Sequence, residues 1–147
     1  MVDGKKEGIK LTAKKFDPKV EVENVIDWIR NWFEKNGSGC NAIIGMSGGK
    51  DSTIVAKLLV EALGKDRVIG VGMPEGTQSL NDADKICEWL GIKFKVVNIG
   101  ETCEAERRAI VNAGETLSVQ ADQNIPPRIR MTVLYAVAQS NNGRVIN

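Results

Sequence analysis

A short stretch rich in glycine and hydroxyl groups, residues 45–53, carries the side chains best suited to phosphate chemistry. It reads Gly-Met-Ser-Gly-Gly-Lys-Asp-Ser-Thr and lies between an apolar run at 42–44 and an apolar-striped segment at 54–63. Two adjacent glycines allow a sharp turn and a close approach to a ligand. The N–H groups at the start of a following helix form a seat for phosphate. Lys50 would add a positive charge, and Asp51 offers a carboxylate for a metal ion bound to the phosphates.

Two common nucleotide-binding motifs do not account for this stretch. A Walker A loop needs a glycine and a Ser or Thr at the positions that Ile44 and Asp51 occupy here. The dinucleotide fingerprint G-x-G-x-x-G occurs nowhere in the chain. The remaining pattern, Ser-Gly-Gly-x-Asp-Ser at 47–52, resembles the pyrophosphatase loop of ATP-dependent amidating and thiolating enzymes. The alternative is a glycine-rich turn that binds no ligand.

Strands and helices alternate along the chain, as judged from the spacing of apolar residues. Strands are predicted at 42–44, 68–73 and 93–99 and from 144 onward. Helices are predicted from Pro18 (behind an Asp17 cap) to about 36, then at 53–63, 83–90, 101–111 and 128–139. This alternation predicts an α/β fold, a doubly wound parallel sheet of Rossmann-like type with helices on both faces. If the first strand is central, with the second and third on one side and the fourth on the other, residues 45–53 lie at the switch point where ligands bind.

Local signals give further expectations. Ser79 and Asp82 have the spacing of a capping pair. Pro126-Pro127 can begin a helix but is not expected inside one. The first helix is predicted to bury one apolar face, which consists of Val22, Val25, Ile26, Ile29, Trp32 and Phe33.

Composition narrows the class of protein. The 147 residues include 42% apolar and 27% charged residues, as expected for a globular domain. The net charge of +1 gives no reason to expect nucleic acid or membrane binding. The absence of histidine excludes His-based acid–base catalysis and the usual zinc sites. Three cysteines without close pairing, and no apolar segment of a secretory signal, predict reduced thiols in a cytoplasmic protein.

Three motifs in the same order resemble those of NAD synthetases, over about residues 20–147. The first is the 45–53 loop, and the second runs from Met73-Pro74 to Leu90-Gly91. The third, 124–131, fits the Asn-x-x-x-Arg-x-Arg-Met segment of that family, with Pro-Pro where many members have Lys-Ala. The resemblance implies the adenine nucleotide alpha-hydrolase type of fold, with about four strands present here and the C-terminal part of the family's domain missing. The nucleotide-binding domain is expected at 17–147, and a flexible basic arm is expected at 1–16 because residues 1–15 carry five lysines and little apolar periodicity.

The resemblance implies ATP-dependent amidation of deamido-NAD to NAD, with ammonia as the nitrogen donor. ATP and Mg²⁺ would bind at the loop, with Asp51 as metal ligand and Asp51 and Lys50 as catalytic residues. Asn124 and Arg128 would bind deamido-NAD. The expected ATP-binding residues are Gly45, Met46, Ser47, Gly48, Gly49, Lys50, Asp51 and Ser52. The family also implies a homodimer for a full-length form, and ammonia that is free or supplied by another protein.

Two alternatives stay open at the level of sequence. One is another enzyme with the same loop, such as a GMP-forming amidotransferase or a tRNA-modifying thiolase. The segment 124–131 and the lack of a Cys-x-x-Cys pair argue against it. The other is a non-catalytic or incomplete ATP-binding fragment, because NAD synthetases are considerably longer than this chain.

Overall fold

The computed structural model describes residues 16–146. The elements follow in the order α1 (Pro18–Asn36), β1 (Asn41–Gly45), α2 (Lys50–Leu63), the short 3-10 helix η1 (Lys65–Arg67), β2 (Val68–Gly72), α3 (Asn81–Leu90), β3 (Lys93–Val96), α4 (Gly100–Asn112), α5 (Val119–Ser140) and β4 (Gly143–Ile146). The basic arm expected at 1–16 lies outside the described residues except for Phe16, whose side chain is exposed. No helix within 16–146 is long and apolar enough to cross a membrane.

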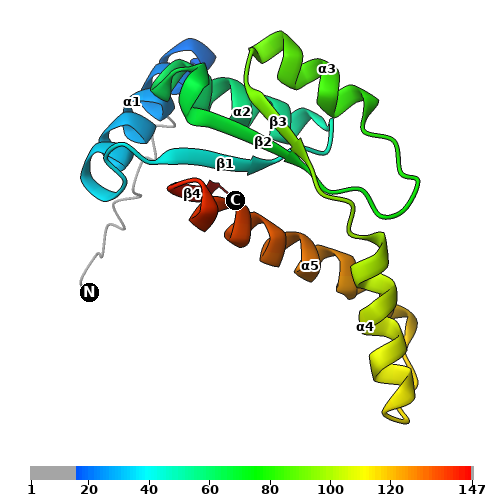
Figure 1. The fold of residues 1–147 in the computed structure, drawn as a ribbon. Helices are drawn as coiled ribbons and strands as arrows, with labels where there is room; N and C mark the ends of the chain where they lie inside the picture. The colour runs from blue at the N-terminus through cyan, green and yellow to red at the C-terminus, as the bar shows by residue number, and fades with distance from the viewer. Residues whose placement is uncertain (1–15, 147) are drawn as a thin grey trace, which may run out of the picture.

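The strands of this part of the chain form one parallel sheet in the order β3-β2-β1-β4 (Figure 1). Central β1 pairs Ala42 with Val68 of β2 and Ile43 with Val145 of β4. The predicted α/β fold and the predicted strand order are both confirmed. The carboxyl end of β1 is therefore the switch point of the sheet.

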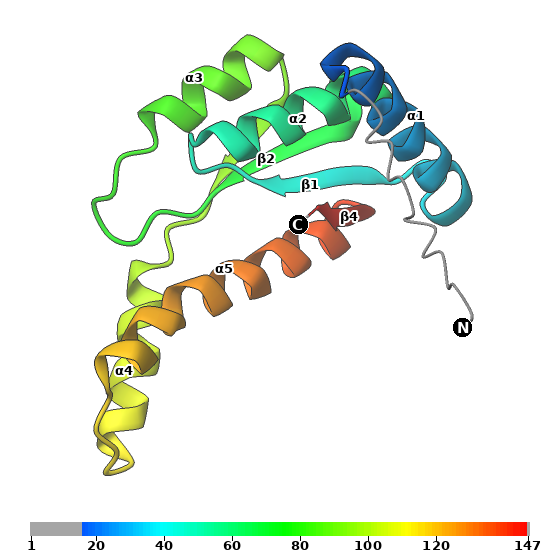
Figure 2. The same ribbon diagram turned by 180° about the vertical axis from the view of Figure 1, so that it is seen from behind.

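Helices cover both faces of the sheet. Figures 1 and 2 show α1, α2 and α3 on one face and α5 on the other. Because neighbouring strand residues point to opposite faces, Ala42 and Ile44 join the apolar cluster under α1–α3, whereas Ile43 joins the cluster under α5. Each face thus has its own core, and β2 between them is buried along its whole length.

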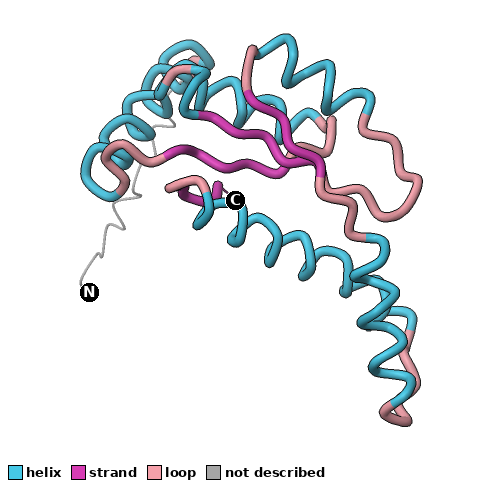
Figure 3. The backbone as a smooth tube through the Cα atoms, in the orientation of Figure 1, coloured by secondary structure: helices cyan, strands magenta, loops and turns pink. Residues whose placement is uncertain are grey.

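The helices α4 and α5 extend beyond the sheet. Figure 3 shows α4 and the first turns of α5 running away from the carboxyl ends of the strands, while the last turns of α5 lie under β1 and lead into β4. The helix α5 thus connects a region outside the sheet with its edge strand.

Some predicted boundaries were wrong. The helix α2 begins at Lys50 rather than Thr53, and β3 ends at Val96 rather than at 99. The expected capping pair does not form, because α3 begins at Asn81 and its N-cap is Leu80. The Ser79 hydroxyl instead accepts a hydrogen bond from the N–H of Asn81, at 3.3 Å. It therefore closes the turn before the helix.

The start of α5 was also predicted wrongly. The helix begins at Val119 behind a Ser118 cap, whose hydroxyl accepts from the N–H of Ala121 at 3.2 Å. Pro126 and Pro127 lie inside it. Proline has no N–H, so the helix gives up two hydrogen bonds there. Burial of this face of α5, including Pro126 itself, offsets that loss.

The predicted apolar face of α1 is buried only in its second half. Ile29 and Phe33 are buried, and Trp32 packs beside them. Val22 and Val25 are exposed, contrary to expectation. The helix periodicity was correct, but the amino-terminal turns of α1 find no covering element among residues 16–146.

Candidate functional site

The loop between β1 and α2 is fixed at its start by β-type pairing. Gly45 ends β1, and the next residue, Met46, donates its N–H to the carbonyl of Val71 at 2.9 Å. The Met46 side chain is buried in the core. The Met46 N–H is thus used within the sheet, while the residues after it turn outward.

The turn requires a glycine at position 48. Its φ of +81° lies in the left-handed region that favours glycine. A Cβ at this position would lie 3.0 Å from the Cβ of Asp82 and 3.1 Å from the N of Ala83. The loop backbone therefore packs directly on the start of α3, and no larger residue fits without moving one of them.

Hydroxyl groups hold the loop in shape. The Ser47 hydroxyl accepts from the N–H of Gly49 at 3.2 Å and lies 3.4 Å from the Ser52 hydroxyl. Ser52 and Thr53 both donate to the carbonyl of Gly49, at 3.1 Å and 2.8 Å. Gly49 is the N-cap of α2, and no side chain caps the helix there. The first N–H groups of α2 thus face outward from a loop that is already ordered, which suits an anion.

Lys50 and Asp51 occupy the first turn of α2, and both are exposed. Within residues 16–146 no group of three or more His, Cys, Asp or Glu is placed to hold a metal ion. Within these residues Asp51 would therefore belong to a set of at most two such ligands. Mg²⁺ is commonly held by one or two carboxylates together with phosphate oxygens and water, so the donors present fit a magnesium–nucleotide complex.

A cavity of about 290 Å³ lies beside the loop. It is lined by Gly45, Met46, Ser47, Met73, Gln78, Ser79, Leu80 and Arg130. The half-buried Arg130 reaches it from α5 and donates to the carbonyl of Met73 at 3.1 Å and to Oε1 of Gln78 at 3.5 Å. An arginine fork in this position suits a phosphate or a carboxylate.

Asn124 and Arg128 lie elsewhere. Both are exposed on the first half of α5, and the Arg128 guanidinium donates to the backbone carbonyl of Asn124 at 3.0 Å. They line a different cavity of about 260 Å³, together with Glu106 and Ile110 of α4. The structure therefore brings these two predicted residues together with each other, but not into the cavity beside the loop.

Arg130 is the site residue that sequence reasoning missed. It belongs to the segment 124–131 that carries the family resemblance, but its apolar neighbours gave no sign that it turns toward the loop. The only signal was its place as the second arginine of Asn-x-x-x-Arg-x-Arg-Met. Its approach to Met73 depends on how α5 packs under the sheet.

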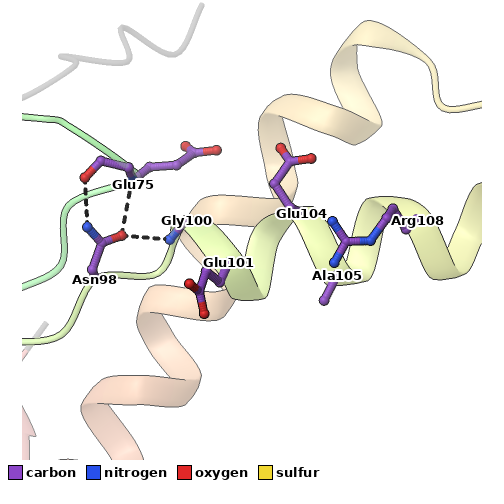
Figure 4. Close-up of a pocket in the computed structure, with 8 residues that line it drawn as sticks. Glu75, Asn98, Gly100, Glu101, Glu104, Ala105 and Arg108 are labelled. Carbon is purple, nitrogen blue, oxygen red and sulfur yellow. Dashed lines mark hydrogen bonds between the residues drawn. The ribbon is translucent and has the colours of Figure 1, made fainter.

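Another cavity, of about 1150 Å³, lies between the β2–α3 loop and the start of α4 (Figure 4). The Asn98 amide joins its two walls. The side-chain oxygen accepts from the N–H of Gly76 at 3.2 Å and of Gly100 at 2.9 Å, and the NH₂ donates to the Gly76 carbonyl at 2.7 Å. The carboxylates of Glu75, Glu101 and Glu104 line it, together with the guanidinium of Arg108.

The cysteines take no part in these cavities. All three are buried, and none forms a disulfide bond within residues 16–146. Burial, and then the nearby Asp84, raises the pKa of Cys87 to about 11. Burial also raises the pKa of Cys103. These two thiols stay neutral near pH 7 and are poor nucleophiles there.

A parallel α/β sheet with a glycine- and hydroxyl-rich loop at its switch point is the Rossmann-like arrangement, in which ligands bind at the carboxyl ends of the strands. A family model described as NAD synthase matches residues 21–147, and the chain belongs to that family. The resemblance to NAD synthetases is thereby confirmed, over nearly the residues expected. Family membership also disfavours the other enzymes that share the loop.

Individual relatives agree with this assignment. The chain is 42% identical over 125 residues to the NH(3)-dependent NAD(+) synthetase of Methanococcoides burtonii, covering 83% of this chain and 46% of that protein. It is 40% identical over 112 residues to that of Methanococcus aeolicus, covering 74% and 43%. The chain thus spans about half the length of the curated relatives it matches.

Solved structures agree in fold. The NH3-dependent NAD synthetase from Campylobacter jejuni, in complex with the nitrate ion, superposes with a TM-score of 0.79 at 29% identity, covering 90% of this chain and 56% of that one. The NMN synthetase from Francisella tularensis superposes with a TM-score of 0.77 at 26% identity, covering 89% and 54%.

Proposed function

We propose that this chain is the ATP-binding part of an ammonia-dependent NAD synthetase. The observation that carries the proposal is the Ser-Gly-Gly loop at the switch point, ordered by its own hydroxyls and opening onto the uncapped start of α2. In a chain of this family, such a loop at the start of a helix is suited to bind a triphosphate.

In this proposal the loop binds the phosphates of ATP. The N–H groups around Gly49 and the dipole of α2 stabilise the negative charge that grows on the leaving pyrophosphate. Lys50 adds a positive charge, and Asp51 would hold Mg²⁺, which neutralises further phosphate charge. Arg130 lies across the adjacent cavity from Ser47. There it would bind the α-phosphate or the substrate carboxylate.

The reaction of the whole protein would proceed in two displacements. A carboxylate oxygen of deamido-NAD attacks the α-phosphorus, and the bond to pyrophosphate breaks. Ammonia then attacks the activated acyl carbon, a proton is lost, and AMP leaves to give NAD. Asn124 and Arg128 would hold the dinucleotide, in a cavity separate from the ATP loop. Residues that correspond to the other half of the relatives would complete the site.

Further parts of the proposal concern the setting of the protein. We infer that the full-length form is a homodimer and that ammonia arrives free or from another protein. The three free thiols support a reducing, cytoplasmic location. Neither nucleic acid nor membrane is expected as a partner, given the net charge of +1.

The test is ATP–pyrophosphate exchange that depends on deamido-NAD, measured on the chain and on Asp51→Asn, which keeps shape and removes charge. Exchange that requires deamido-NAD and is lost in the variant supports the proposal. ATP binding without exchange supports the ATP-binding role alone, as an incomplete ATP-binding fragment whose catalysis needs the residues that correspond to the other half of the relatives. Lack of both contradicts a nucleotide function for this chain.

A second candidate substrate is nicotinate mononucleotide, because one solved structure that this fold matches is an NMN synthetase. The chemistry at the carboxylate is the same, and the two substrates differ in the adenylate half. Running the exchange assay with each compound separates them. A preference for the mononucleotide would leave the ATP loop as proposed and exclude a dinucleotide role for Asn124 and Arg128.

A further inference from the structure

Arg107 of α4 joins three separate parts of the chain. Its Nε lies 2.5 Å from Oδ1 of Asp122 on α5, and one terminal nitrogen lies 3.0 Å from Oε1 of Glu75 in the β2–α3 loop. The other terminal nitrogen lies 2.8 Å from Oε1 of Glu104, one turn away on α4. The Arg107 side chain is only 22% exposed. All three guanidinium nitrogens are thus engaged, in a geometry that a lysine cannot copy.

The helix α5 is weakest just where Arg107 binds it. A helical N–H bonds the carbonyl four residues earlier, so Pro126 and Pro127 leave the carbonyls of Asp122 and Gln123 without helical donors. Residues 119–125 are therefore tied to the rest of α5 by fewer hydrogen bonds. Asp122 belongs to this first segment, and the ion pair with Arg107 supplies an anchor from outside the helix.

Through Glu75, Arg107 is linked to the wall of the cavity beside the Ser-Gly-Gly loop. Glu75 donates its backbone N–H to Oε1 of Gln78 at 3.4 Å. The same Gln78 oxygen accepts from Arg130, and both side chains line the cavity beside the Ser-Gly-Gly loop. Arg107 therefore connects the loop that walls this cavity with the segment of α5 that carries Asn124.

We propose that Arg107 is a positioning residue that sets the first turns of α5, with Asn124, against the β2–α3 loop, and so aligns the dinucleotide-binding residues with the ATP loop. This inference rests on the proposed function. It assigns to Arg107 an effect on deamido-NAD binding rather than on ATP binding, because Arg107 contacts neither the Ser-Gly-Gly loop nor α2.

The test compares Arg107→Met, which keeps the length of the side chain, with Arg108→Met. Arg108 is the next residue on α4, is exposed, and forms no ion pair within residues 16–146, so it is a matched control. Calorimetry on the chain gives the affinity for ATP and, in the presence of ATP, for deamido-NAD. Hydrogen exchange of the backbone over 119–125 reports on the helix without any ligand.

We expect Arg107→Met to weaken deamido-NAD binding at least about tenfold, since misplacement by about 1 Å can cost far more than the loss of one contact. ATP affinity should stay within about twofold, and exchange over 119–125 should accelerate. Arg108→Met should change none of these. Combining Arg107→Met with Asp122→Asn should add no further loss, because both remove the same ion pair.

Other results would overturn the inference. Unchanged exchange over 119–125 would show that Arg107 does not hold the helix. Equal losses of ATP and deamido-NAD affinity would show a general effect on the fold instead of positioning. If the unaltered chain binds ATP but no deamido-NAD, the positioning role fails for this chain while the ATP-binding function stands. If it binds neither, the ATP-binding function itself fails.

Discussion

Replacing Gly48 with alanine should lower the free energy of unfolding more than the same replacement at a glycine that has a similar φ but open space around it. Gly39 supplies the comparison, because its φ of +72° is close to the +81° of Gly48 but a Cβ on it would meet nothing within 4 Å. Both substitutions force alanine into the left-handed region. Only Gly48→Ala also pushes a methyl group against the start of α3.

The expected magnitudes follow from this difference. Holding a non-glycine residue in the left-handed conformation costs about 1–2 kcal/mol of unfolding free energy, and this cost should appear in both variants. At Gly48 the Cβ would lie 3.1 Å from the backbone N of Ala83, so α3 or the loop must shift by a few tenths of an ångström. Overpacking of this kind costs about 1–3 kcal/mol. Gly48→Ala should therefore lose about 2–5 kcal/mol of unfolding free energy.

Urea unfolding measures the free energy of unfolding of each variant, and calorimetric titration measures its affinity for ATP. A shifted loop should bind ATP at least about tenfold more weakly, which corresponds to about 1.4 kcal/mol. Gly39→Ala should keep the ATP affinity of the unaltered chain. If the two variants lose the same stability and both retain ATP affinity, the close packing of Gly48 on α3 has no role in shaping the site.

Two further predictions concern α5 and the core. Ser118→Ala removes the N-cap of α5 and should cost about 1 kcal/mol in urea unfolding, whereas Ser118→Thr should retain most of it; equal losses would show that the hydroxyl does not cap. The pKa of Cys87 is raised to about 11 in the folded chain from an ordinary 9.0, so its neutral thiol favours the folded state below pH 9 and this advantage is lost as the pH rises toward 11. The urea midpoint should fall over that range, and less so in Cys87→Ala; identical pH profiles would contradict the assignment.

Periodicity predicted the elements and the layers because both depend on patterns within short segments, whereas the strand order followed only on the condition that the first strand is central. Near-continuous apolar runs such as 68–73 mark strands buried on both faces. The rule of right-handed crossovers then leaves few arrangements. The loop at 45–53 was found for the same reason, since its residue types and its place between a strand and a helix are adjacent in sequence.

Features that depend on contacts between distant segments were not predictable. The local preference of proline predicts the start of a helix at the two adjacent prolines. It does not take into account the burial that keeps Pro126 inside α5. Arg130 enters the cavity because α5 packs against β1 and β4, which brings the guanidinium to the Met73 carbonyl beyond the end of β2. The Arg107 contacts join residues 15 and 32 positions apart, and nothing in the local sequence marks them. Glu75 and Asp122 each look like ordinary surface carboxylates.

The two strand pairings of β1, with β2 and with β4, differ in the length of chain that separates the paired residues. On one side Ala42 pairs with Val68, 26 residues later, and on the other Asn41 pairs with Gly143, 102 residues later. Loop-closure entropy grows as (3/2)RT ln n, so the second pairing costs about 1.2 kcal/mol more to close. The Ser-Gly-Gly loop and its α3 wall belong to the locally closed half. Asn124, Arg128 and Arg130 belong to the half whose attachment relies on the packing of α5, so the anion-binding loop has the lower entropic cost of assembly.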